Sequence, residues 1–430
     1  MRIDQLHLEN FRGYESVDFT FDKHFNLIIG ANGSGKTALL EALTISMGSF
    51  FLGIRNTDSR HIHPHDVHYQ GYESSVEHRF PTIVKADGVV QDKSITWQRE
   101  LTGFKSKTLF RSALGIKEIA IEIDKKIRNG DTSIILPALA YYATGRLFIE
   151  AANTKFQNTT NGEKGRFRSY KNCLQAKSTF KHFAQWYKTK ELAEIQKKQK
   201  SQALAVIKKA IIDNIPGCQN IFYEFDPDMV SGLIIEMGNN RTLPFEYLSD
   251  GTRNYLALIA DLAFKCVTLN PQLEGEALLE TPGVVLIDEL DLHLHPEWQR
   301  KIIKSLQKTF PKIQFFATTH SPFLIQEVQR NQLIKLDTDN IVDGLGGDDL
   351  SIEDIAENIQ GVPNPQWSTK KQELYDFAKE YYKSLKEGKS SIGKMEIKLA
   401  KKLKPFSQNP AFDAFIEQIR LSEKNIDEAS

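Results

Sequence analysis

The chain has 430 residues and carries 55 Lys plus Arg against 55 Asp plus Glu, so its formal net charge at pH 7 is zero. This length is enough for more than one ordinary domain with a large buried core, and the charge balance excludes a global electrostatic attraction to nucleic acid or to membranes. Three cysteines without a CxxC pair argue against a disulfide framework or a zinc knuckle and favour a reducing compartment.

The N-terminus has no signal-peptide pattern, and no window approaches the roughly 18 unbroken apolar residues of a membrane helix, so we expect a cytoplasmic protein without membrane contact. Residues 3–11 alternate loosely between apolar and polar side chains and residues 17–21 do so strictly, which predicts two strands of a half-exposed antiparallel sheet. The turn between them carries Arg12, which we expect close to the next strand. Spacing alone leaves a solvated turn arginine as an equal alternative.

A phosphate-binding loop comes next. Residues 25–29 form an apolar run that predicts a buried strand, and the following GANGSGKT, residues 30–37, matches G-x-x-x-x-G-K-[ST]. The glycines let backbone N–H groups surround phosphate oxygens, Lys36 offers its charge to the β- and γ-phosphates, and the Thr37 hydroxyl suits Mg²⁺. Residues 38–43 are strong helix formers, so a helix N-terminus should face the anion. The pattern predicts a nucleotide site that includes Asn32, Gly33, Ser34, Gly35, Lys36, Thr37 and Ala38.

Polar and β-like segments follow up to residue 146. Four histidines crowd into residues 61–68, where a metal site is one interpretation, but Pro64 breaks the spacing and we favour a solvated loop. Residues 80–100 and 118–124 alternate between apolar and polar side chains and predict strands of a β-rich lobe. The apolar run 136–142 predicts another strand, whose end would bring Arg146 toward the nucleotide.

Residues 151–210 are strongly basic, with 14 Lys or Arg against three acids. The part from 153 to 170 is rich in Asn, Thr, Gly and Lys and predicts a mobile loop, whereas residues 180–213 have helical spacing. Residues 166–171 interleave charged and aromatic side chains, as nucleic-acid surfaces do. The alternative is a solvated, lysine-rich helical face, so nucleic-acid binding through 151–210 is a hypothesis.

Residues 219–245 again alternate as strands do, and a second anion-binding position follows. The segment LSDGTRN, residues 248–254, precedes an amphipathic helix. Ser249 at the N-cap, with its hydroxyl free, and the backbone of Gly251 would form an anion-binding helix start. Helix capping alone explains the pattern equally well.

Two further strands end in polar residues. The run 283–287 stops at Asp288 and Glu289, where Asp288 would hold Mg²⁺ opposite Thr37 and Glu289 would polarise the attacking water. After a turn and a helix over 297–310, the strand 314–318 leads to His320, which we place at the γ-phosphate edge. Beyond residue 344 we expect helices over 350–359 and 372–403, and apolar residues over 406–419 that would contact a partner or pack against the body.

These motifs together resemble the ABC-type ATPases of the RecF, SMC and Rad50 group: NFRGY, GANGSGKT, LSDGTRN, VVLIDELDLHLHP and FFATTHSP. The resemblance implies an α/β fold, an ABC-type P-loop ATPase head with a β-rich lobe, an inserted helical region and a helical C-terminal region. The implied parts are 1–150 with Walker A, 151–215 as the basic insertion, 216–345 with the signature, Walker B and switch histidine, and 346–430 as the C-terminal region.

The resemblance also implies ATP and Mg²⁺ as ligands and a head-to-tail dimer or higher homo-oligomer. In such ATPases the signature segment of one subunit closes over the γ-phosphate held by the other. Asp250 departs from the pattern, because many members have glycine there. The roles implied for single residues are Walker A contacts for Lys36 and Thr37, metal ligation for Asp288, general base for Glu289, signature contacts in trans for Ser249 and Gly251, a D-loop position for Asp291, the switch histidine for His320 and a nucleotide-side arginine for Arg12.

Within this group the chain resembles the PtuA ATPases of Septu-type anti-phage defence. Roughly 200 residues between Walker A and the signature are too few for SMC arms, no CxxC hook is present as in Rad50, and the C-terminal region lacks the acidic motifs of a Toprim nuclease. The resemblance implies a sensor ATPase that controls an HNH nuclease subunit. A RecF-like repair ATPase without a nuclease partner is the alternative, and a nucleotide-locked scaffold is a third hypothesis.

Overall fold

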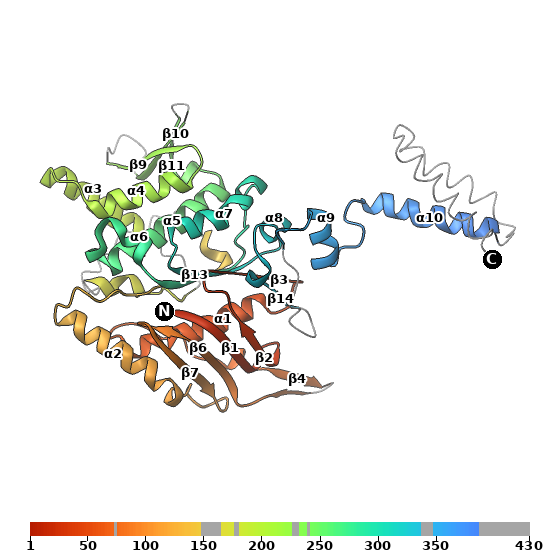
Figure 1. Cartoon of the computed structure of the whole chain (residues 1–430), viewed down its shortest axis with the longest axis horizontal. Coiled ribbons are helices and arrows are strands. Elements are labelled where there is room, and N and C mark those ends of the chain that lie inside the picture. The colour runs from red at the N-terminus through yellow and green to blue at the C-terminus, as the bar shows by residue number, and fades with distance from the viewer. Residues whose placement is uncertain are drawn as a thin grey trace. The chain divides into compact units, whose positions relative to one another are not determined.

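The computed structural model describes residues 1–72, 75–147, 165–175, 180–225, 232–238, 241–336 and 347–386. The chain forms two compact units, Met1–Ile355 and Ala356–Ser430 (Figure 1). Among the described residues, no helix is long and apolar enough to cross a membrane.

The first unit is built around a parallel sheet of five strands in the order β14-β3-β13-β12-β8. Four of these strands are almost entirely buried, in keeping with their continuous apolar runs and with a sheet that is covered on both faces. The edge strand β14 was not predicted, because its four residues carry no run of comparable length. The strands are β3 (Phe25–Gly30), β8 (Ala138–Tyr142), β12 (Gly283–Ile287), β13 (Ile313–Thr318) and β14 (Leu333–Leu336).

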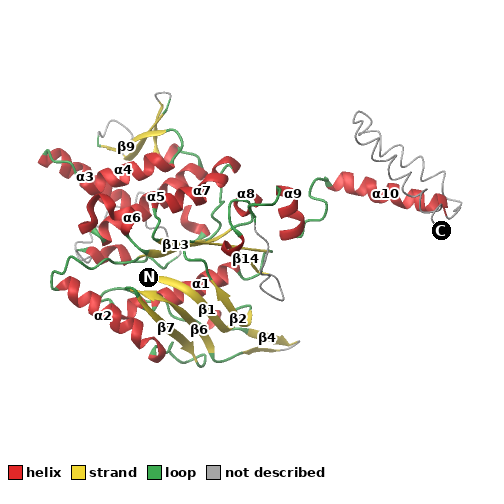
Figure 2. Ribbon diagram, in the orientation of Figure 1, coloured by secondary structure: helices red, strands yellow, loops and turns green. Residues whose placement is uncertain are grey.

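One face of this sheet is covered by α1 (Lys36–Gly48), which also contacts an antiparallel sheet of order β2-β1-β6-β7 (Figure 2). The Trp97 indole donates to the Ser46 carbonyl of α1 at 3.0 Å, and the Gln314 amide bonds both backbone groups of Ile3 at 2.9 and 2.7 Å. The first contact joins the antiparallel sheet to α1, and the second joins it to the parallel sheet. The four antiparallel strands confirm the predicted β-rich lobe. Its strands are β1 (Arg2–Phe11), β2 (Tyr14–Thr20), β6 (Thr82–Val90) and β7 (Lys93–Leu101).

Helices and a small three-stranded sheet lie on the other face (Figure 2). The helix α5 packs on β8 and against α4, and most of its twenty residues are buried. The predicted helical stretch from residue 180 is confirmed as two helices separated at residues 198–201. The elements are α3 (Phe180–Lys197), α4 (Gln202–Asn214), β9 (Cys218–Glu224), β10 (Gly232–Met237), β11 (Arg241–Pro244), α5 (Asp250–Leu269), α6 (Ala277–Glu280) and α7 (Pro296–Thr309). Two short helices, α8 (Pro322–Ile325) and α9 (Ile352–Asp354), follow later in the chain.

The strand predicted over residues 118–124 is wrong, because this segment lies within the helix α2 (Leu114–Arg128). Ile119, Ile121 and Ile123 alternate as in a strand, but Ile121 is 46% exposed. The buried apolar positions are instead Ile116, Ala120 and Ile123, which are three or four residues apart and share one helix face. Because isoleucines also occur at every second position, the sequence of this segment is typical of a strand even though its buried residues follow the period of a helix.

A short hairpin was also not predicted: β4 (Tyr69–Tyr72) pairs with β5 (Ser75–His78), and most of its side chains are exposed. In the second unit, α10 (Thr369–Lys386) confirms the first part of the predicted helix from residue 372. A π-helix over Ile355–Ile359 completes the helical segment predicted near residue 350. The rest of the predicted 372–403 helix and the apolar segment 406–419 lie outside the described residues.

Candidate nucleotide site at the carboxyl edge of the parallel sheet

The phosphate-binding loop joins β3 directly to α1, as the motif predicts. Gly33 and Gly35 have φ values of 85° and 100°, in the left-handed region that glycine adopts at low cost. Gly35 is the N-cap of α1 and no side chain caps this helix end. The N–H groups of its first turn therefore remain available for an anion, and the helix dipole favours negative charge there.

Lys36 lies over this loop. Its ammonium donates to the carbonyl oxygens of Gly30 and Ala31 at 2.8 and 2.9 Å. Burial lowers the pKa of Lys36, while the carboxylates of Asp288 and Glu289 act in the opposite direction. The charge of Lys36 is thus held at the loop and close to the acidic end of β12.

Tyr14 is a site residue that the sequence analysis missed. Its hydroxyl donates to the Gly35 carbonyl at 3.2 Å, and burial raises the pKa of Tyr14. A Cβ at Gly35 would lie 2.5 Å from that hydroxyl, so a larger residue at the helix start would require the Tyr14 side chain to move. The sequence places Tyr14 in the turn beside Arg12 but gives no sign that it reaches the loop.

Asp288 and Thr37 meet at the carboxyl edge of the sheet, as predicted. The Thr37 hydroxyl donates to one carboxylate oxygen of Asp288 at 3.1 Å, and the Thr318 hydroxyl donates to the other at 2.6 Å. The same Thr318 oxygen accepts from the Glu289 N–H at 2.7 Å. An alcohol and a carboxylate oxygen beside a phosphate-binding loop are the donor set that Mg²⁺ prefers, so these residues fit that ion.

The residues that follow β12 and β13 are linked to each other. Thr319 donates to the Asp291 carboxylate at 2.5 Å, which ties the segment after Asp288 to the end of β13. Glu289 has a positive φ of 51°, and His320 is exposed directly beyond Thr319. Their catalytic roles stay predictions, but both residues lie at the edge where the phosphate loop begins.

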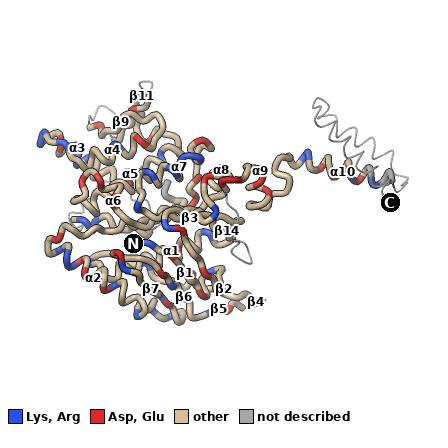
Figure 3. The backbone as a smooth tube through the Cα atoms, viewed as in Figure 1, with Lys and Arg blue, Asp and Glu red and all other residues tan. Residues whose placement is uncertain are grey.

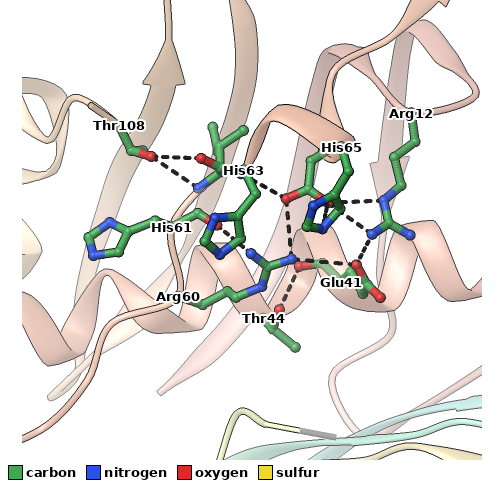
Figure 4. A network of polar contacts seen from close by, with 10 residues as sticks. Arg12, Glu41, Thr44, Arg60, His61, His63, His65 and Thr108 are labelled. Atoms are coloured by element: carbon green, nitrogen blue, oxygen red, sulfur yellow. Dashed lines mark hydrogen bonds and ion pairs between the residues drawn. The ribbon is translucent and has the colours of Figure 1, made fainter. Parts of the chain in front are cut away.

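Arg12 lies in a partly buried ion-pair cluster, so the alternative of a solvated turn arginine is wrong (Figure 4). Its guanidinium contacts the Asp66 carboxylate at 3.1 and 2.9 Å and also bonds Glu41 of α1. Arg60 contacts the same two carboxylates at 3.2 and 3.5 Å. Because Asp66 is fully buried and Glu41 belongs to the phosphate-loop helix, this cluster couples Arg12 to α1.

The histidine-rich loop agrees with the prediction in part. His61, His63 and His65 are exposed, as expected for a solvated loop. Among the described residues, no group of three or more His, Cys, Asp or Glu side chains is arranged to hold a metal ion. Asp66, however, is not a solvated loop residue. It accepts from the His63 N–H at 2.9 Å and closes a short helical turn, so the loop is folded around a buried carboxylate.

The signature segment begins α5. The Ser249 hydroxyl was predicted to be free, but it is engaged with Thr252 at the helix start. The Ser249 oxygen accepts from the Thr252 N–H at 3.4 Å and lies 2.8 Å from the Thr252 hydroxyl. Gly251 is buried, and a Cβ there would lie 2.2 Å from the His293 carbonyl oxygen of the same chain. Within one chain, these two residues therefore cap α5 and allow its close approach to the loop that follows Asp291.

This approach makes Gly251→Ala destabilising. Alanine normally stabilises a helix by about 1 kcal/mol relative to glycine, but here its Cβ would overlap the His293 carbonyl. We expect a net loss of about 1–3 kcal/mol in the free energy of unfolding, measured by urea denaturation. Gly103→Ala is the matched control, because the nearest atom would be 4.0 Å away. Equal stabilities of the two variants would contradict this packing role.

The charged and aromatic segment 166–171 does not form the exposed alternating surface that the nucleic-acid hypothesis requires. Residues 166–170 form a short helix in which Phe167 and Tyr170 are buried, and the Tyr170 hydroxyl donates to the Pro137 carbonyl at 2.8 Å. Arg166 donates to the Leu269 carbonyl at 2.6 Å. Phe167 and Tyr170 are core residues, although their spacing in the sequence is also typical of a nucleic-acid surface. Residues 151–164 and the side chain of Arg146 lie outside the described part of the chain.

The chain matches one protein family model and is similar in sequence to several named proteins. The family model described as "AAA domain, putative AbiEii toxin, Type IV TA system" matches residues 25–326. "Retron Ec83 probable ATPase" of Escherichia coli is 28% identical over 75% of this chain and 69% of its own length. "Septu protein PtuA" of Bacillus thuringiensis is 27% identical over 84% of each chain. A solved structure, "Crystal structure of the SmcHead bound to the C-winged helix domain of ScpA", matches with a TM-score of 0.47 and 17% identity over 78% of this chain and 94% of that chain.

Proposed function

Because the chain belongs to this AAA-domain family and is an ATPase related to PtuA, we propose that it binds and hydrolyses ATP as the regulatory subunit of an anti-phage defence complex and controls a partner HNH nuclease. The observation that carries the ATPase part is the contact between Thr37 and Asp288, 3.1 Å apart at the phosphate-binding loop. The defence role is supported by similarity to "Septu protein PtuA".

Each residue at the carboxyl edge has a distinct task in this proposal. Thr37 and Asp288 would hold Mg²⁺, which supplies charge neutralisation at the β- and γ-phosphates. Lys36 contributes a second positive charge to these phosphates, and the N–H groups from Gly33 to Ala38 bind their oxygens. Glu289 accepts a proton from the attacking water, and His320 contacts the γ-phosphate edge.

We further propose that two chains complete each site. In one chain, the contacts of Ser249 and Gly251 are with the first turn of α5 and the loop near His293. The start of α5 at Ser249 and Asp250 is exposed, which suits a contact with the phosphates bound by a second copy. The assembly would be a head-to-tail dimer or a higher homo-oligomer.

A nucleic-acid contact through residues 151–210 also stays a proposal, now without the aromatic residues of 166–171. Lysines recur along α3, one of the described parts of this segment (Figure 3). Lys188, Lys190 and Lys197 are the basic residues of that helix with described side chains.

The partner is tested by purifying the tagged Glu289→Gln chain from its native cells with ATP and identifying co-purified proteins by mass spectrometry. We expect a small HNH nuclease to be retained, because the variant should hold ATP without hydrolysing it. The Lys36→Ala chain is the matched control, since it should not hold ATP. Recovery of nucleic acid and this chain without a nuclease would contradict the proposal and favour the RecF-like alternative.

A further inference from the structure

A second pocket of about 740 Å³ lies in the first unit. It is lined by the segment after α1 (Asn56 to Asp58), the short helix with Arg168, the helix α3 and the middle of α5. None of the residues proposed for ATP binding lines it. Its volume is within the range of roughly 300–1,000 Å³ that is typical of small-molecule sites.

The inner wall of this pocket is aromatic. Trp186 and Phe264 are 8% and 5% exposed, and their ring centroids lie 5.3 Å apart. Asn56 and Gln185 add amide groups that can donate and accept hydrogen bonds. The pocket thus combines the apolar surface and the amides that a planar, heteroatom-rich ring needs.

The rim is positively charged. The Arg168 guanidinium lies over the Phe264 ring at 5.8 Å, has no carboxylate partner among the described residues, and burial lowers the pKa of Arg168. Lys171 is a second exposed cation of the lining, and Asp58 is the one acid among the described lining residues. An arginine that is partly desolvated and not paired with an acid is well suited to a phosphate group.

Two polar residues lie at the floor of the pocket, and one of them lacks a hydrogen-bond partner among the described residues. Lys265 lines the pocket but pairs with Asp261 at 3.1 Å, so the charge available to an anion comes mainly from Arg168 and Lys171. Ser169 also lines the pocket, and its buried hydroxyl has no hydrogen-bond partner among the described residues. A buried hydroxyl without a hydrogen-bond partner costs free energy, and a bound polar group that pairs with Ser169 would remove this cost.

We propose that this pocket binds a nucleotide unit, with the phosphate at Arg168 and Lys171 and the base against Trp186 and Phe264. The unit is a free mononucleotide or the 5′-phosphorylated end of a single strand. This site goes beyond the proposed ATPase function and does not depend on it.

The floor of the pocket is also connected to the ATP site. Asp261 accepts from the Tyr142 hydroxyl at 2.7 Å, and the Tyr142 carbonyl accepts from the Asp288 N–H at 2.8 Å. Lys265 at the pocket and Asp288 at the sheet edge are therefore joined through two intervening residues.

The test uses the full-length Lys36→Ala chain, in which the phosphate loop is impaired, and two probes: AMP and a 5′-phosphorylated hexamer of thymidine. Trp186 is the reporter, and Trp186→Phe shows which part of the fluorescence change arises from it. We expect quenching with both probes and at least tenfold weaker binding in Arg168→Glu. Lys308→Glu on α7, outside both the pocket lining and residues 151–210, is the control with the same negative replacement and should bind normally.

Stronger binding of AMP would identify the ligand as a free mononucleotide, and stronger binding of the hexamer would identify a strand end. The absence of a Trp186-dependent change with both probes at millimolar concentration would overturn the proposal, as would equal affinities of the Arg168→Glu and Lys308→Glu chains. Arg168→Gln, a milder change, should also weaken binding and guards against misfolding. ATP binding by the chain with Lys36 intact is measured separately, so a failure of this pocket is distinguishable from a failure of the ATPase proposal.

Discussion

Glu289→Gln is expected to slow ATP hydrolysis by a factor of roughly 10²–10⁴ while ATP binding is retained. Glutamine keeps the size and polarity of the side chain but cannot accept the proton of the attacking water. The backbone of Glu289 is anchored by its N–H bond to the Thr318 hydroxyl, which does not involve the side chain, so the local fold should persist. Phosphate release under multiple turnover measures the rate, and equilibrium binding of radiolabelled ATP measures the affinity.

Glu297→Gln is the matched control for this prediction. Glu297 is an exposed residue of α7 that pairs with Lys301 at 2.8 Å, and it is not among the residues proposed for the site. The control should hydrolyse ATP at the normal rate. Unchanged turnover in Glu289→Gln would exclude the role of this carboxylate and favour a chain that uses nucleotide as a structural lock.

Thr318→Val is expected to raise the Mg²⁺ concentration needed for half-maximal ATPase activity by about 10–100-fold. Valine has nearly the same shape but loses the hydrogen bond to the Asp288 carboxylate and the one from the Glu289 N–H. Asp288 would then be held less firmly toward Thr37. Leaving buried polar groups without a partner should also cost about 1–3 kcal/mol of the free energy of unfolding.

Thr268→Val is the control that separates these effects. Thr268 is also buried, at 8% exposure, but its hydroxyl has no hydrogen-bond partner among the described residues. The change should therefore leave both stability and Mg²⁺ dependence nearly unchanged. A Thr318→Val chain with the normal Mg²⁺ requirement would contradict the positioning role of Thr318.

Features that depend on a local motif, or on one general rule of sheet geometry, were predicted well. The phosphate loop, the buried runs of β3, β12 and β13, and the meeting of Thr37 with Asp288 follow from motif spacing and from the rule that parallel strands end at one edge. The strand order that brings β3 next to β13 was not predicted, because a sequence of buried strands carries no record of their neighbours.

Contacts between distant segments escaped prediction for the same reason. Tyr14 reaches Gly35 across 21 positions, and Asp66 binds Arg12 across 54. Thr318 resembles any polar residue at a strand end until the fold places it between Asp288 and Glu289. In two other places a local pattern was misleading. Residues 118–124 alternate as a strand does but form part of the helix α2, and the aromatic residues near Phe167 are spaced as on a nucleic-acid surface but are buried.

The most direct test of the central claim, an ATP site shared between two chains, is a mixing experiment. Ser249→Arg blocks the signature of its chain, and Lys36→Ala impairs the phosphate loop of its chain, so each variant alone should be inactive. Equal mixing should restore up to about a quarter of the normal ATPase rate, because half of random dimers are mixed and each of these has one intact site. No recovery in a mixture of two folded variants would contradict the shared site.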